Sequence, residues 1–174
     1  MADVVQKALE FASIAHDGQT RKYTGEPYIV HSIEVMGLVK EVIDDPEVHA
    51  AALLHDVVED CDVTVEDVEH HFGPRISSMV DDLTDISRME DGNRAVRKEL
   101  DRQHLAKASP DAQSVKLADL INNSMSIVKD DPSFAKVYMK EKALLLEVLT
   151  EGNPRLFSLA AKIVEDYKKG VKNL

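Results

Sequence analysis

The chain has 174 residues and a formal net charge of −11 at pH 7, because 32 Asp and Glu outnumber 21 Lys and Arg. This balance excludes a non-specific nucleic-acid binder, which needs a basic surface to displace counterions from phosphates. Hydrophobic residues make up 44% of the sequence, enough to fill a core at this length, and no apolar run reaches the roughly 20 residues of a membrane-spanning helix. With one cysteine and no signal-peptide pattern, the sequence indicates one soluble cytoplasmic domain over residues 1–174.

Apolar residues recur at intervals of three and four along most of the chain, which is the period of amphipathic helices. A first helix is predicted from 3 to 15, a polar loop follows over 19–28, and a second helix carries His31 in its first turn. Strictly alternating runs rich in β-branched residues are absent, so we predict an all-α, compact bundle of eight or nine helices. The further helices are predicted at about 33–42, 47–59, 65–72, 75–87, 92–107, 114–129, 133–150 and 154–168.

Residues 50–60 concentrate the candidates for chemistry. Because successive residues of a helix are about 100° apart, His55, Asp56, Glu59 and Asp60 are predicted to share one helical face. The simpler interpretation is an amphipathic helix with a solvated charged side. However, three carboxylates within five residues repel one another, and a bound cation relieves that repulsion. An imidazole beside a carboxylate suits a divalent ion such as Mn²⁺ with open positions for water.

Two other polar residues stand within apolar runs and are candidates to complete a metal site. His31 ends the run Pro27-Tyr-Ile-Val-His31, although a lone histidine in such a place is more often a hydrogen-bonded core residue than a ligand. Asp119 lies among leucine, alanine and isoleucine, where a carboxylate is costly to bury without a positive partner. Asn123 follows four residues later on the same helical face, as a ligand-orienting amide or a capping one.

The order His31, His55-Asp56, Asp119 resembles the H…HD…D signature of the HD-domain metal-dependent phosphohydrolases. The surrounding sequence, over about residues 8–138, is similar to the hydrolase domain of the Rel/SpoT stringent-response enzymes. With no room for a synthetase domain, the chain resembles a free-standing small alarmone hydrolase. The segments that carry this resemblance are 21–31, 52–60, 72–73 and 115–119.

The resemblance implies an all-helical enzyme with one Mn²⁺ per chain that removes the 3′-pyrophosphate from guanosine tetra- and pentaphosphate, giving GDP or GTP. The expected partner is the nucleotide substrate, and neither a nucleic acid nor a membrane is expected. An oligomer is possible, but the sequence does not indicate one. The implied metal ligands are His31, His55, Asp56 and Asp119, and the implied residues for water activation and proton transfer are Glu59 and Asp60. The implied substrate contacts are Arg21, Lys22, Asn123, Tyr138 and Arg94.

Three departures from the family pattern concern substrate recognition. Leu120 stands where relatives usually carry Arg or Lys, and Asn122-Asn123-Ser124 replaces the usual His-Asn-Met or Tyr-Asn-Leu. Asp85 follows Thr84 and stands where relatives commonly carry a lysine. The adenosine alarmones ppApp and pppApp are therefore alternative substrates. Two further alternatives are an HD phosphohydrolase acting on another nucleotide and a helical regulatory module that keeps a metal for stability or sensing.

Overall fold

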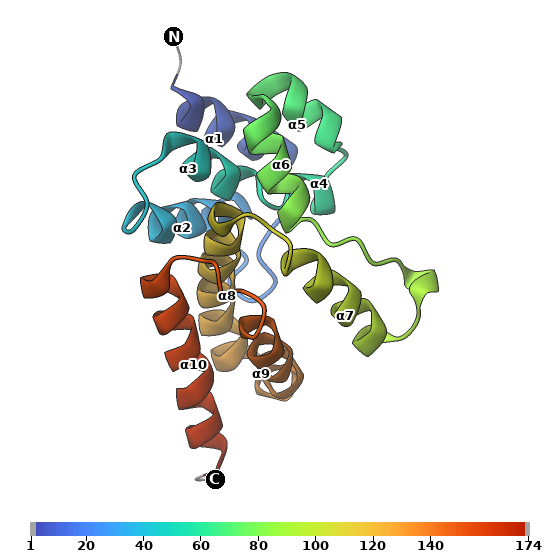
Figure 1. Ribbon diagram of the computed structural model, residues 1–174, viewed down its shortest axis with the longest axis vertical. Helices are drawn as coiled ribbons and strands as arrows, with labels where there is room; N and C mark the ends of the chain where they lie inside the picture. The colour runs from blue at the N-terminus through green and yellow to red at the C-terminus, as the bar shows by residue number, and fades with distance from the viewer. Residues whose placement is uncertain (1–2, 173–174) are drawn as a thin grey trace.

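The computed structural model describes residues 3–172, which form ten α-helices and one short 3₁₀ helix (Figure 1). Across these residues the structure holds no β-strand beyond a single bridge between Thr20 and Pro27, so the all-α prediction is confirmed. The helices are α1 (Val4–Ala15), α2 (Ile29–Lys40), α3 (Pro46–Leu54), α4 (Val57–Asp60), α5 (Val65–Phe72), α6 (Pro74–Leu83), η1 (Met89–Asp91), α7 (Arg94–Leu105), α8 (Pro110–Asp130), α9 (Pro132–Leu146) and α10 (Pro154–Lys172).

Capping residues explain where several helices begin. The Thr64 side chain accepts a hydrogen bond from the backbone of Asp67, whose carboxylate accepts one from the Thr64 backbone in return, so α5 starts with a capping box. α8 begins at Pro110, earlier than predicted, because Ser109 caps it by accepting from the backbone of Ala112 and proline favours the first helical position.

The structure differs from the predicted helices at the two places that matter for chemistry. The predicted helix with His31 in its first turn and the helix predicted over 33–42 are one continuous helix, α2. The helix predicted over 47–59 is interrupted, because α3 ends at Leu54 and α4 begins at Val57. At Asp56 the backbone has φ −106° and ψ −1°, away from helical values. His55 and Asp56 therefore lie in a break and do not share one regular helical face with Glu59 and Asp60.

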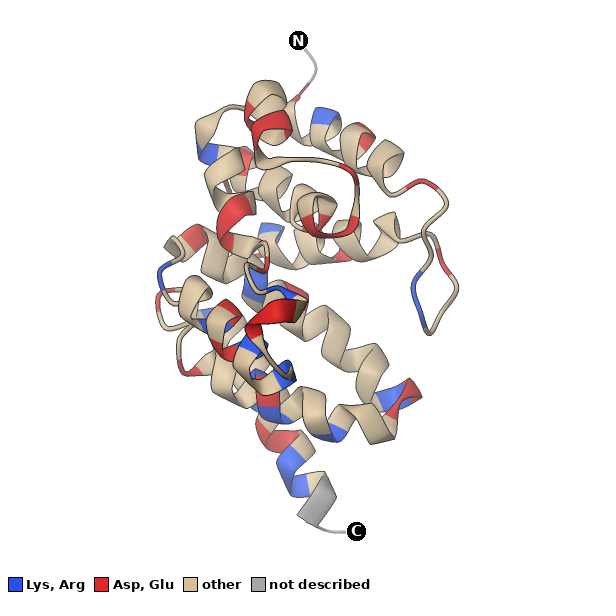
Figure 2. Ribbon diagram, turned by 90° about the vertical axis from the view of Figure 1, so that its right-hand side faces the viewer, with Lys and Arg blue, Asp and Glu red and all other residues tan. Residues whose placement is uncertain are grey.

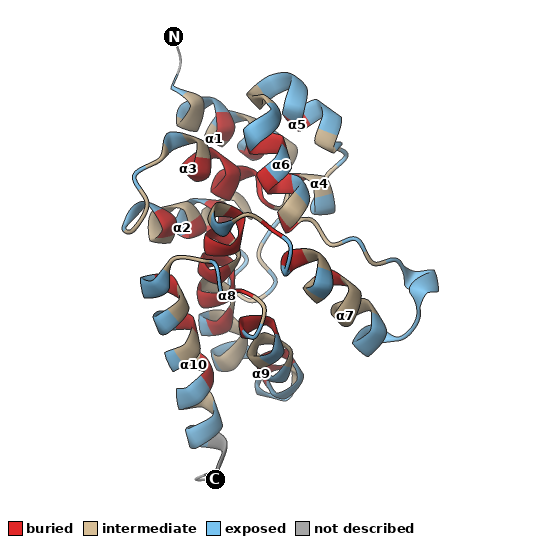
Figure 3. Ribbon diagram, in the orientation of Figure 1, coloured by how far each residue is buried: buried red, intermediate tan, exposed pale blue. Residues whose placement is uncertain are grey.

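The core is centred on α3 and α8, and Figure 3 shows both as largely buried ribbons surrounded by helices with exposed outer faces. Every residue from 48 to 54 in α3 is buried. α8 packs against α2, α3, α6, α9 and α10, whereas α7 projects from the side of the molecule and contacts mainly α6 and η1 (Figure 1). Polar residues on α2, on α8 and in the break after α3 therefore meet inside the protein.

Charge is distributed unevenly along the fold. Only five of the 21 basic residues precede residue 81. In Figure 2 the half of the molecule nearer the N-terminus is accordingly mostly tan and red, and blue segments gather in the half nearer the C-terminus. Within residues 3–172, no helix combines the length and the hydrophobicity that crossing a membrane requires.

Candidate active site

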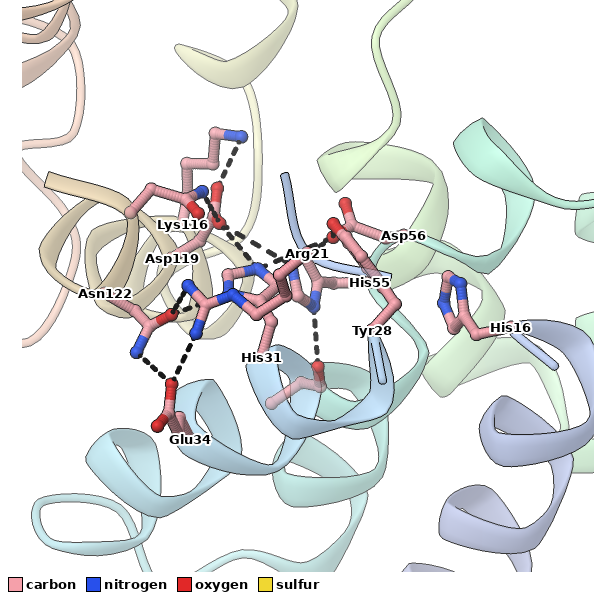
Figure 4. Close-up of polar contacts among 12 residues, drawn as sticks. His16, Arg21, Tyr28, His31, Glu34, His55, Asp56, Lys116, Asp119 and Asn122 are labelled. Atoms are coloured by element: carbon pink, nitrogen blue, oxygen red, sulfur yellow. Dashed lines mark hydrogen bonds and ion pairs between the residues drawn. The ribbon is translucent and has the colours of Figure 1, made fainter. Parts of the chain in front are cut away.

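Four predicted metal ligands converge from three elements (Figure 4). His31 lies in the first turn of α2, His55 and Asp56 occupy the break between α3 and α4, and Asp119 comes from α8. His55 Nε2 is 2.9 Å from Asp56 Oδ2, and His31 Nε2 is 3.2 Å from Asp119 Oδ1. The ligand atoms of His31, His55 and Asp56 all lie within 4.8 Å of one another. Asp119 Oδ1 also lies 3.7 Å from His55 Nε2 and so closes the group from the α8 side.

His31 and His55 each form a hydrogen bond through Nδ1, which leaves Nε2 of each ring available to a ligand. His55 Nδ1 is 2.7 Å from the carbonyl oxygen of Ala52, and His31 Nδ1 is 2.7 Å from the side-chain oxygen of Asn122. Because a carbonyl oxygen only accepts, each Nδ1 donates. Both Nε2 atoms are buried without a hydrogen bond of good geometry, although they face carboxylates. Two imidazole nitrogens and two carboxylates aimed at one point are a donor set that fits a divalent cation.

The electrostatics of this group favour a positive charge at its centre. Burial alone would lower the pKa of His55, but the negative charge of Asp56 and the contact with Asp119 outweigh burial and raise that pKa. Burial would likewise raise the pKa of Asp56, yet His55 outweighs it and lowers the pKa. The two carboxylates thus favour a proton on Nε2 of His55. A bound metal ion would displace that proton, because the ion needs the same nitrogen.

Asp119 has the positive partner that its buried position requires. Lys116 Nζ lies 3.0 Å from Asp119 Oδ2, and Asn123 donates to Asp119 Oδ1 at 2.7 Å. Burial opposes ionisation of Asp119, but the charge of Lys116 and the contacts with His31 and His55 together outweigh it and keep the pKa of Asp119 well below its usual range. Lys116 was missed in the sequence, although its spacing of three residues from Asp119 on one helix was a usable signal.

Tyr28 is a second residue that the sequence did not single out. Its hydroxyl donates to Asp56 Oδ2 at 2.6 Å. Burial, followed by the charge of Asp56, raises the pKa of Tyr28 and keeps the hydroxyl protonated as a donor. Ligating carboxylates are commonly held by such outer hydrogen bonds, and the Tyr28 side chain fixes Asp56 in this way.

Glu59 and Asp60 lie in α4. They follow closely after His55 and Asp56, which with His31 and Asp119 are called the metal group. Burial, and then the negative charge of Asp85, raise the pKa of Glu59 to about 7. Burial and the charge of Asp56 raise the pKa of Asp60 as well. A carboxyl group with a pKa near neutrality can both accept and donate a proton at the pH of the cell. Glu59 lines a cavity of about 440 Å³ together with Val58, Thr84, Asp85, Ser87, Arg94, Arg97 and Lys98.

The residues predicted to contact substrate fall into separate places. Three of them, Arg21, Lys22 and Asn123, line a cavity of about 150 Å³ that His31 also borders. Arg94 lies in the cavity of Glu59, where it makes two hydrogen bonds to Glu141. Tyr138 is buried with its hydroxyl unpaired and lines neither cavity. The structure therefore brings four of the five near the metal group or Glu59.

A family model described as an HD domain matches residues 8–141. The chain belongs to the HD-domain family. Hydrolases of this HD-domain family are metal-dependent, and His31, His55 and Asp56 form a group that could hold such a metal.

Relatives of known name and structure agree with this assignment. The chain is 39% identical to guanosine-3′,5′-bis(diphosphate) 3′-pyrophosphohydrolase MESH1 of Drosophila melanogaster over 130 residues, which cover 73% of this chain and 71% of that protein. It is 42% identical to a guanosine-3′,5′-bis(diphosphate) 3′-pyrophosphohydrolase of Vibrio cholerae over 88 residues, which cover 51% of this chain and only 12% of that protein. A solved structure described as a metazoan ortholog of SpoT that hydrolyses ppGpp matches with a TM-score of 0.84 at 31% identity, covering 96% of this chain and 97% of the other.

Proposed function

We propose that this HD-domain protein is a Mn²⁺-dependent 3′-pyrophosphohydrolase of (p)ppGpp-type alarmones and that residues 1–174 act as one domain. One observation carries the proposal: two buried imidazole nitrogens without hydrogen bonds face two carboxylates, next to a glutamate whose pKa is about 7. The activity printed for the MESH1 relative and for the SpoT ortholog supports the choice of substrate.

In this proposal His31, His55, Asp56 and Asp119 hold the metal ion. When bound there, Mn²⁺ supplies Lewis-acid polarisation of a phosphoryl oxygen and favours ionisation of water. A bond forms between the water oxygen and the 3′-phosphorus while the bond from phosphorus to the ribose 3′-oxygen breaks, releasing pyrophosphate. Glu59 and Asp60 divide the proton transfers, one accepting from water and the other donating to the ribose oxygen. The pKa of Glu59, about 7, suits this residue to either role, and the pKa of Asp60 is shifted in the same direction.

The distribution of positive charge supports binding of a polyanionic nucleotide by an acidic protein. The cavity beside His31 carries Arg21 and Lys22, and the cavity beside Glu59 carries three basic residues. Local positive potential in a cleft can attract a ligand that the net charge repels. In the proposed complex the nucleoside lies in the smaller cavity and phosphates extend toward Arg94 in the larger one.

The preferred base stays a prediction. Leu120, in the place of a basic residue of relatives, is fully buried and does not reach the nucleotide cavities. Base recognition then depends on side chains of the smaller cavity such as Arg21 and Asn123. The adenosine alarmones ppApp and pppApp accordingly remain the alternative substrates to be compared directly.

The test is release of pyrophosphate from ppGpp and, in parallel, from ppApp by the purified protein with Mn²⁺ and then with a chelator. We expect release that requires the metal. His55→Ala should lose Mn²⁺ binding and turnover together, whereas Glu59→Gln should keep Mn²⁺ and lose turnover by roughly 10² to 10⁴-fold. Absence of release from both nucleotides while Mn²⁺ still raises the melting temperature would replace this proposal with a non-catalytic metal module or another nucleotide substrate.

A further inference from the structure

Beside the metal group lies a closed hydrogen-bond network centred on Asn122 of α8 (Figure 4). The side-chain oxygen of Asn122 lies 2.7 Å from His31 Nδ1 and 3.0 Å from Arg21 Nη2. Its side-chain nitrogen donates to Glu34 Oε2 at 2.8 Å, and the same carboxylate oxygen accepts from Arg21 Nη1 at 3.0 Å. Arg21 of the loop before α2, Glu34 of α2 and Asn122 of α8 thus form a closed ring, and His31 joins it through the Asn122 oxygen.

The chemistry of the ring determines where the proton of His31 resides. A guanidinium group only donates, so the Asn122 atom that faces Arg21 must be the oxygen. The amide nitrogen of Asn122 then faces the acceptor Glu34, which agrees with this orientation. Because the oxygen also lies at hydrogen-bond distance from His31 Nδ1, that nitrogen must carry the hydrogen. In the neutral imidazole the lone pair is therefore on Nε2, the buried nitrogen that points at the carboxylates.

We propose that Asn122 is a positioning residue that holds the metal ligand His31 and the pocket residue Arg21 with a single oxygen. This inference rests on the proposed function only for the identity of the reaction. Its evidence is the set of hydrogen bonds around Asn122. Metal-binding histidines typically donate their second ring N–H to an oxygen that fixes tautomer and orientation. Here an amide that also fixes an arginine fills this place, so the metal site and the nucleotide cavity share one support.

The neighbouring residue strengthens the assignment. Asn123 donates to Asp119 Oδ1 at 2.7 Å, so consecutive residues of α8 orient two different ligands. Arg21 has only 12% of its side-chain surface exposed, and two of its N–H groups are occupied by Asn122 and Glu34. Arg21 is thereby held at the wall of the smaller cavity before any nucleotide arrives.

The test is calorimetric titration of the metal-free protein with Mn²⁺, which needs no substrate. Asn122→Leu replaces the amide by an apolar group of similar size, and we expect the Mn²⁺ affinity to fall by roughly 10- to 100-fold. Glu34→Gln is the matched control, because an amide oxygen can accept from both Arg21 and Asn122 as the carboxylate oxygen does. Its Mn²⁺ affinity should stay close to that of the unchanged protein.

A rescue and a spectroscopic readout separate positioning from general damage. In Asn122→Asp with Glu34→Ala, the new carboxylate still accepts from His31 and Arg21, and the second change removes the Glu34 carboxylate that would otherwise oppose it. Glu34 is 45% exposed, so water can take its place. Mn²⁺ affinity should therefore return. Long-range ¹H–¹⁵N spectra of the metal-free protein at alkaline pH should show hydrogen on Nδ1 of His31 in the unchanged and rescued proteins and a mixture of tautomers in Asn122→Leu.

Unchanged Mn²⁺ affinity together with an unchanged tautomer in Asn122→Leu would overturn the inference. If that variant does not fold, Asn122→Ala, which adds no bulk, is judged by the same two readouts. Failure of the proposed function appears elsewhere, as absence of pyrophosphate release by the unchanged protein, and leaves the Mn²⁺ titration interpretable.

Discussion

Replacing Lys116 by methionine should destabilise the metal-free protein far more than an ordinary loss of an ion pair. Lys116 and Asp119 expose only 16% and 8% of their side chains, and their charged atoms are 3.0 Å apart. At an effective dielectric constant of about 20, this separation corresponds to an attraction of about 5.5 kcal/mol. Removing one partner of a buried pair typically costs about 3 to 5 kcal/mol, because the other charge is left uncompensated. Since His55 also faces Asp119, we expect a cost of about 3 kcal/mol.

The assay is urea unfolding of metal-free protein followed by circular dichroism, with the free energy of unfolding extrapolated to water. Lys162→Met is the matched control, because Lys162 forms the same kind of pair with Asp166 but the two side chains are 69% and 56% exposed. An exposed pair contributes about 0 to 1 kcal/mol. Saturating Mn²⁺ should reduce the deficit of Lys116→Met, since the metal replaces the lost positive partner of Asp119. A loss in Lys116→Met no larger than in Lys162→Met would refute this reasoning.

Three further outcomes are expected. Asp85→Asn removes a negative charge that raises the pKa of Glu59, so that pKa should fall below about 7. The limb of the pH profile of kcat/KM that Glu59 governs should then move to lower pH, and a profile with both limbs unmoved would contradict the role of Asp85. Tyr28→Phe removes the hydrogen bond to Asp56 and should weaken Mn²⁺ binding by roughly tenfold in calorimetry, whereas equal affinity would show that the hydroxyl does not orient the ligand. Arg94→Met should raise KM for ppGpp and leave Mn²⁺ affinity unchanged, and a loss of metal instead would place Arg94 in the metal group.

Local sequence was sufficient for the helical class of the fold. Periodic apolar residues and caps such as Ser109 act within a few residues along the chain, so they predict helices without knowledge of the packing. The same local reasoning failed between residues 47 and 60. Periodicity continues through His55 and Asp56, yet the backbone leaves helical geometry at Asp56, and no residue in that segment is a proline or glycine that would announce a break.

The metal group shows which parts of a site a sequence motif can predict. The residue types His31, His55, Asp56 and Asp119 were predicted as one set by resemblance, and the structure brings them together. Their roles in binding and in catalysis remain predictions. The positive partner of Asp119 was within reach of the sequence, because Lys116 lies one helical turn away.

The residues that support the metal group are identified by contacts between segments far apart in the sequence. Asn122 meets His31 across 91 residues and Arg21 across 101, and Arg94 meets Glu141 across 47. These contacts depend on how α2, α7, α8 and α9 pack against one another. That packing is set by the buried apolar faces of helices from all parts of the chain. Local periodicity was enough to predict helices, and the motif named the side chains that could bind a cation. Packing decided the tautomer of His31, the restraint on Arg21 and the cavity that surrounds Glu59, because distant helices supply their partners.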